Sequence, residues 1–171
     1  MTTLILTVAG ADRPGLVAAV ADVVDAHGGN WENSSLAELA GTFAGVIEVS
    51  VPTERTGELE TALRGIQGQG LLTLSVLTGT PGPSEDEEQL LVMQVLGNDR
   101  PGIVREVSAV LNAHALSIEE LTTETREAAM AGGRLFEASV IAKVPPTVDL
   151  DALRADLERL ASEIQVDITL G

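Results

Sequence analysis

The sequence predicts an α+β protein made of two similar halves, each a four-stranded antiparallel sheet with two helices on one face. The first observation is a repeat: Gly10-Ala-Asp-Arg-Pro-Gly-Leu-Val17 returns as Gly97-Asn-Asp-Arg-Pro-Gly-Ile-Val104, 87 residues later. The second is that apolar runs with strand and helix spacing follow the same order in both halves. The third is the length of 171 residues, which suits two small domains with separate cores.

The first half begins with an aliphatic run at 4–9, which is typical of a buried strand. We expect residues 10–13 to form a tight turn and Pro14 to occupy the first position of a helix. The glycines at 28–29 should end that helix, because glycine readily takes the left-handed conformation. Its predicted apolar face consists of Leu16, Val17, Val20, Val23 and Val24.

The rest of the first half predicts two strands, a helix and a last strand. The strands at 30–39 and 42–51 should form a hairpin, and Pro52 should end the second of them. Apolar residues at helical spacing around 59–66 indicate the helix, and the run at 71–77 indicates the fourth strand.

The second half repeats this order. Ten of the eighteen residues in 10–27 are identical to those in 97–114. Further on, the offset grows from 87 to 93 residues, and the additional residues predict a longer hairpin loop at 127–134. Strand-helix-strand-strand-helix-strand is the ferredoxin-like arrangement. We therefore expect one domain at 1–78, a linker rich in proline, glycine and acidic residues at 79–89, and a second domain at 90–171.

The composition disfavours several classes of function. The net charge is −16, from 10 basic and 26 acidic residues, and both halves are acidic, so we expect no direct binding to nucleic acid. There is no cysteine, which excludes disulfides, thiolate metal sites and a cysteine nucleophile. No apolar run is long enough to span a membrane, and no basic residue precedes the first one as in a secretory leader. We expect a cytoplasmic protein.

The repeated turn has the chemistry to hold a free amino acid. A helix N-terminus presents unpaired N–H groups and a partial positive charge to a carboxylate. Gly15 and Gly102 would let a ligand approach the backbone, and Asp12 and Asp99 could receive an ammonium group. The alternative is that the motif is only an efficient strand-to-helix turn. The residues alone leave both open.

Other candidate sites are weaker. His27 and His114 hold equivalent positions at helix ends, where we expect them to cap the helices and not to bind a metal. Asn30 belongs to a cluster of amide and hydroxyl side chains that could line a polar pocket, although a solvent-facing strand explains it equally well. No catalytic motif is present, so we expect no enzyme activity and no cofactor.

The doubled motif, with Asn30-Trp-Glu-Asn-Ser-Ser-Leu-Ala37 and Phe43, resembles the ACT domain family of small-molecule sensors. A chain of two such domains and little else is similar to the glycine cleavage system transcriptional repressor family. The resemblance implies an amino acid bound at the turn between the first strand and the first helix. With Asn30 added, the expected ligand-binding residues are Gly10, Asp12, Arg13, Pro14, Gly15, Asn30, Gly97, Asn98, Asp99, Arg100, Pro101 and Gly102.

The resemblance also implies a mode of action. Regulators of this family contact a DNA-binding protein and not DNA, which agrees with the charge of −16. We therefore expect a sensor of a small amino acid, glycine or serine, that controls transcription through a protein partner. The alternative is a regulatory subunit that binds an enzyme of amino-acid metabolism. Association of two chains into a homodimer stays open.

Overall fold

The computed structural model describes residues 1–80, 89–130 and 132–171, and the chain divides into two compact units, Met1–Pro83 and Ser84–Gly171. Most of the expected linker at 79–89 lies outside the described residues. The first unit contains β1 (Thr2–Ala11), α1 (Leu16–Ala26), β2 (Asn30–Leu39), β3 (Thr42–Val51), the short 3₁₀ helix η1 (Thr53–Arg55), α2 (Thr56–Gly68) and β4 (Thr73–Thr78). The second contains β5 (Gln89–Asn98), α3 (Ile103–Ala113), β6 (Ser117–Glu127), β7 (Arg134–Val144), α4 (Leu150–Ile164) and β8 (Val166–Leu170).

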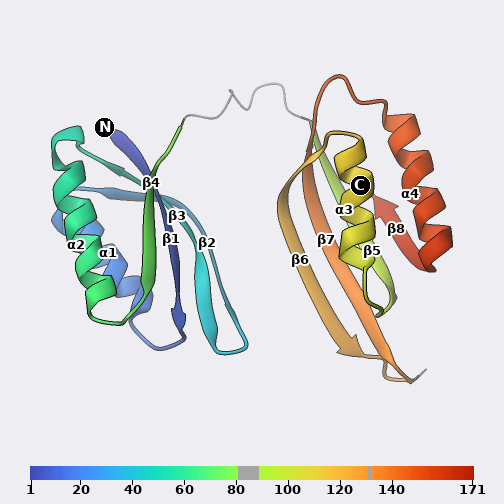
Figure 1. Ribbon diagram of the computed structural model, residues 1–171, viewed down its shortest axis with the longest axis horizontal. Coiled ribbons are helices and arrows are strands. Elements are labelled where there is room, and N and C mark those ends of the chain that lie inside the picture. Colours follow the sequence, from blue (N-terminus) through green and yellow to red (C-terminus); the bar gives the residue numbers. More distant parts are fainter. Residues whose placement is uncertain (81–88, 131) are drawn as a thin grey trace. The chain divides into compact units, whose positions relative to one another are not determined.

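Each unit is an antiparallel sheet of four strands whose two helices cover one face (Figure 1). The strand order is β2-β3-β1-β4 in the first unit and β6-β7-β5-β8 in the second. The first strand of each unit is therefore central, and the second strand lies at one edge. This confirms the predicted pair of ferredoxin-like folds.

The core of each unit lies between its sheet and its helices. Alternate residues of β1 face the helices, so Leu4, Leu6 and Val8 are buried together with Leu16 and Val20 of α1. Burying such a side chain contributes about 1.5–3 kcal/mol. The second unit uses the same pattern, with Met93, Val95, Ile103, Val107 and Leu111 buried. The chain has few aromatic residues, and both cores are mainly aliphatic, with Phe136 buried in the second.

The turn after the first strand differs from the prediction. Pro14 is not the first residue of a helix, because α1 begins at Leu16 and Gly15 is its N-cap with φ of 89°. Gly10 is not part of the turn either, since β1 continues to Ala11 and Gly10 pairs with Phe43 of β3. The proline-glycine pair thus sets the direction of the chain before the helix, and the glycine supplies the left-handed step.

Both edge strands β2 and β6 carry a β-bulge near their start. In β2, Trp31 pairs with Val49 and Asn33 pairs with Glu48, so Glu32 is an extra residue. In β6 the register shifts at the equivalent place, between Ile118 and Glu120. Because of the bulge, Trp31 and Leu36 both pack against the core although they are five residues apart.

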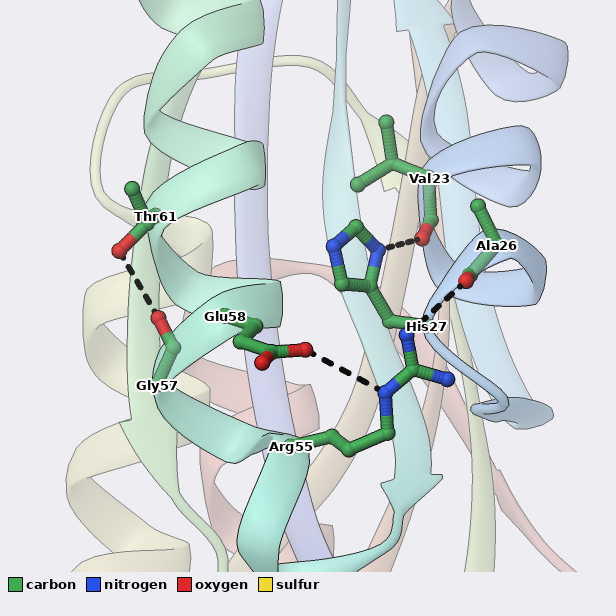
Figure 2. A network of polar contacts seen from close by, with 7 residues as sticks. All are labelled: Val23, Ala26, His27, Arg55, Gly57, Glu58 and Thr61. Carbon is green, nitrogen blue, oxygen red and sulfur yellow. Dashed lines mark hydrogen bonds and ion pairs between the residues drawn. The ribbon is translucent and has the colours of Figure 1, made fainter.

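The end of α1 is joined to the start of α2 by a small polar network (Figure 2). Arg55 Nη2 donates to the carbonyl oxygen of Ala26 (3.3 Å), and Arg55 Nε lies 3.4 Å from the carboxylate of Glu58. His27, the C-cap of α1, donates from Nδ1 to the carbonyl oxygen of Val23 (2.7 Å). Cationic and polar side chains at this end satisfy carbonyl groups that the helix leaves free. Within the described residues, no helix is long and apolar enough to cross a membrane.

Candidate functional site

The first turn is held in place by hydrogen bonds to two other parts of its unit. The backbone N–H of Asp12 donates to the carbonyl oxygen of Gly41 in the β2–β3 hairpin (2.9 Å). Arg13 Nη2 donates to the carbonyl oxygen of Gly70, which precedes β4 (3.1 Å). Gly15 then opens α1, and no side chain of the described residues caps this helix. The first N–H groups of α1 therefore have no side-chain partner, and an anion bound there could accept hydrogen bonds from them.

An open pocket with a volume of about 260 Å³ lies against this turn. Its lining consists of Asp12, Arg13, Gly15, Leu16, Val17, Ala18 and Phe43. The pocket thus combines one carboxylate, the start of a helix and an apolar wall. Three of the residues expected from sequence, Asp12, Arg13 and Gly15, are brought together here, and Pro14 lies between them in the chain.

The glycine at the end of each first strand is explained by packing. A Cβ on Gly10 would lie 2.8 Å from the carbonyl oxygen of Leu71, and one on Gly97 would lie 2.5 Å from Val166 Cγ1. These distances are shorter than side chains tolerate. Gly10 and Gly97 therefore support the turns from inside the fold, and they do not line the pocket found at the first turn.

The second turn has the same backbone but different side-chain contacts. Asp99 N donates to the carbonyl oxygen of Arg134 (2.8 Å), and the carboxylate of Asp99 lies 4.0 Å from Arg134 Nε. Gly102 opens α3 with φ of 98°. Arg100 turns back onto the helix, where its Nη2 lies 2.6 Å from Glu106 Oε2. Asn98, the last residue of β5, and Pro101 flank this arrangement.

Asn30 lies away from the turn. It pairs with Ser50 of β3, which in turn pairs with Thr3 near the start of β1. The turn follows Ala11, the last residue of the same strand, so about 27 Å of strand separates the two places. There the side chains of Ser50 and Asn30 hydrogen-bond to Glu32 and lower the pKa of its carboxyl group. Asn30 thus belongs to a polar cluster on the open face of the sheet.

The two histidines are the C-caps of α1 and α3, as expected from their positions. His114 differs from His27 because its Nε2 contacts Asp156 of α4 at 2.8 Å. The described part of the chain holds no cluster of three or more His, Cys, Asp or Glu side chains that could hold a metal ion.

A second depression, which sequence reasoning missed, lies under β6 in the second unit. Its volume is only about 20 Å³, and its lining is almost entirely apolar, from residues that include Ile103, Val107, Leu121 and Phe136. Ile118 also lines it and aligns with Trp31, whose larger side chain packs against the core of the first unit. The smaller side chain of Ile118 at the position of Trp31 is the sequence difference that could have predicted this depression.

Both units match the same family model. The description of that model is "ACT domain", and it matches residues 2–77 and 89–170. The chain belongs to the ACT domain family. The turns that follow β1 and β5 are thus the β–α turns of two tandem ACT domains, and the predicted family is confirmed.

Relatives of similar length support the tandem arrangement. The glycine cleavage system transcriptional repressors of Escherichia coli and Shigella flexneri are each 26% identical over 163 residues, which is 94% of this chain and 85% of theirs. The crystal structure of an unknown protein from Galdieria sulphuraria is 32% identical with a TM-score of 0.83, over 99% of this chain and 96% of that one. The similarity to each of these proteins therefore extends over both ACT domains of this chain.

Proposed function

We propose that this chain is a cytoplasmic regulatory protein without enzyme activity. It binds a small amino acid at the β1–α1 turn of its first ACT domain and acts on transcription through a protein partner. The observation that carries this proposal is the pocket at Asp12, Arg13 and Gly15. Its helix start supplies N–H groups for a carboxylate, and the carboxylate of Asp12 supplies a partner for an ammonium group. A free amino acid carries both groups on one carbon atom.

Glycine and serine are the proposed ligands. The relatives in Escherichia coli and Shigella flexneri are named for the glycine cleavage system, which supports glycine. Serine differs from glycine by one hydroxymethyl group, and the open pocket has room for it.

A protein partner is favoured over DNA by the charge of the chain. With a net charge of −16, the chain would be repelled by the phosphates that supply most non-specific affinity for DNA. The related repressors are named for an effect on transcription, and contact with a DNA-binding protein is a route to that effect without direct DNA contact.

Isothermal titration calorimetry of the full chain against the twenty amino acids tests the proposal. We expect glycine or serine to bind with a Kd below 1 mM and larger side chains to bind more weakly. If no amino acid binds more tightly than 1 mM, the sensor function is wrong, and the turn is only a structural connection. A gel-shift titration with duplex DNA at low salt should show no complex with the chain alone.

A further inference from the structure

The two ACT domains differ in what lies over the left-handed glycine of the turn. At Gly15, no atom beyond the neighbouring residues lies within 4 Å of the place where a Cβ would be. At Gly102, the same place is covered: Glu106 Oε1 lies at 3.5 Å, Arg105 Nη2 at 3.9 Å and Arg100 Nη1 at 4.0 Å. The space over the left-handed glycine is thus open in the first domain and in contact with charged side chains in the second.

Glu106 holds this cover in place with both carboxylate oxygens. Its Oε2 lies 2.6 Å from Arg100 Nη2, and its Oε1 lies 3.7 Å from Arg105 Nη2. Arg100 is fixed further because its Nη1 donates to the carbonyl oxygen of Pro101 (3.2 Å). The side chain of Glu106 is only 27% exposed and that of Arg100 37%, so solvent screens the pair incompletely.

The carboxylate of Glu106 also places a negative charge near the start of α3, although it makes no hydrogen bond to the first N–H groups of that helix. It lies in the first turn of α3, where a negative charge is stabilised by the partial positive charge of the helix start. In the first domain the equivalent residue is Ala19, and the first turn of α1 has no acidic residue. Arg13, the counterpart of Arg100, is bound to Gly70 instead.

We propose that Glu106 acts as an internal carboxylate that closes the second ACT domain to amino acids. Only the first domain then takes a ligand, and the chain binds one amino acid. This inference rests on the proposed function of the turn. It makes residue 106, together with its counterpart at 19, the position that decides which domain binds.

The test exchanges the two equivalent residues in the full chain. Glu106→Ala gives the second turn the side chain of the first, and Ala19→Glu does the reverse. Glu158→Ala, on the exposed side of α4, is the control for the loss of one negative charge. Calorimetry with glycine counts the sites, and amide NMR shows whether residues 16–18 or 103–105 respond.

We expect one glycine per chain for the unchanged protein and for Glu158→Ala, with shifts at 16–18. Glu106→Ala should bind two, with new shifts at 103–105. Ala19→Glu should weaken the first site at least tenfold. Two sites in the unchanged protein, or no response at 103–105 in Glu106→Ala, would overturn the inference.

If the unchanged chain binds no glycine, sodium acetate replaces it as a simple carboxylate that needs only the helix start. Glu106→Ala should then gain an acetate response at 103–105 that the unchanged chain lacks. The absence of that gain would show that Glu106 does not close the turn.

Discussion

His114 Nε2 lies 2.8 Å from Asp156 Oδ2 and joins the end of α3 to α4 in the second ACT domain. Arg159 contacts the other carboxylate oxygen of Asp156 at 3.1 Å. The first domain has Ala62 at the position of Asp156, and there His27 bonds to its own helix. The hydrogen bond from His114, with a smaller contribution from Arg159, lowers the pKa of Asp156.

Asp156→Asn should destabilise the second domain, and the difference should depend on pH. Because the folded-state pKa of Asp156 is lowered, its stabilising effect is complete above the usual aspartate pKa of about 4 and is lost as the pH falls through the lowered value. Urea unfolding followed by circular dichroism at several pH values measures this. A difference between the two proteins that persists well below pH 3 would contradict the assignment.

The only tryptophan provides the matching control. Trp31 packs against the core of the first domain, so its fluorescence follows that domain. Asp156→Asn should leave the fluorescence transition unchanged while the circular dichroism transition moves. An equal movement of both signals would show that the effect is not confined to the second domain.

Gly15→Ala should destabilise the first domain by about 1–2 kcal/mol, since φ is 89° there and an L side chain is strained. Gly65→Ala, inside the exposed part of α2, is the control with the opposite expected sign, about 0.5–1 kcal/mol more stable. Trp31 fluorescence during urea unfolding measures both variants in the same domain. An equal change in stability for both variants would show that the left-handed backbone conformation of Gly15 is not the cause of the destabilisation.

Gly10→Ala should destabilise the first domain by about 1–3 kcal/mol through overpacking, because the new Cβ would meet the carbonyl oxygen of Leu71. Its unfolding midpoint, again from Trp31 fluorescence, should fall relative to that of Gly57→Ala, a glycine with open space around it. An unchanged midpoint would indicate that β4 can move aside. Any loss of ligand binding in this variant would be structural.

Asp12→Asn should weaken glycine binding at least tenfold, because the amide no longer offers a full negative charge to the ammonium group. Asp99→Asn should have no effect if the second turn is closed. Calorimetry with glycine compares the two variants under one buffer condition. Equal weakening by both would favour two working sites, and no weakening by Asp12→Asn would remove the ammonium contact from the proposal.

The sequence predicted the bounds of an element well where a glycine or proline marks the end of a strand. The strands at 30–39 and 42–51 were predicted with their observed bounds, because Gly41 turns the hairpin and Pro52 ends it. The start of α1 was predicted wrongly. A proline followed by a glycine fits either a proline inside the helix or a glycine before it, and only the observed φ of Gly15 decides.

The candidate site was harder to predict from the sequence, because the contacts that distinguish the two turns come from residues far away in the chain. Because the motif is nearly the same in both halves, it predicted the same ligand-binding role for both turns. Arg13 depends on Gly70, which lies in another loop, and Asp99 depends on Arg134 at the start of β7. Asn30 was grouped with the turn, yet the antiparallel pairing of β1 and β3 carries it to the other end of the sheet.

Because β2 and β6 each carry a bulge, the effect of deleting one residue depends on where along the strand the deletion falls. Deleting Glu32 would leave Trp31 opposite Val49 and Asn33 opposite Glu48, so every later side chain would keep its face. Deleting a residue between Asn33 and Leu36 would turn Leu36 out of the core or force the register to slip. Length variation among tandem ACT chains of this kind should therefore be found at the bulge and at the hairpin tips, and not in the middle of the edge strands.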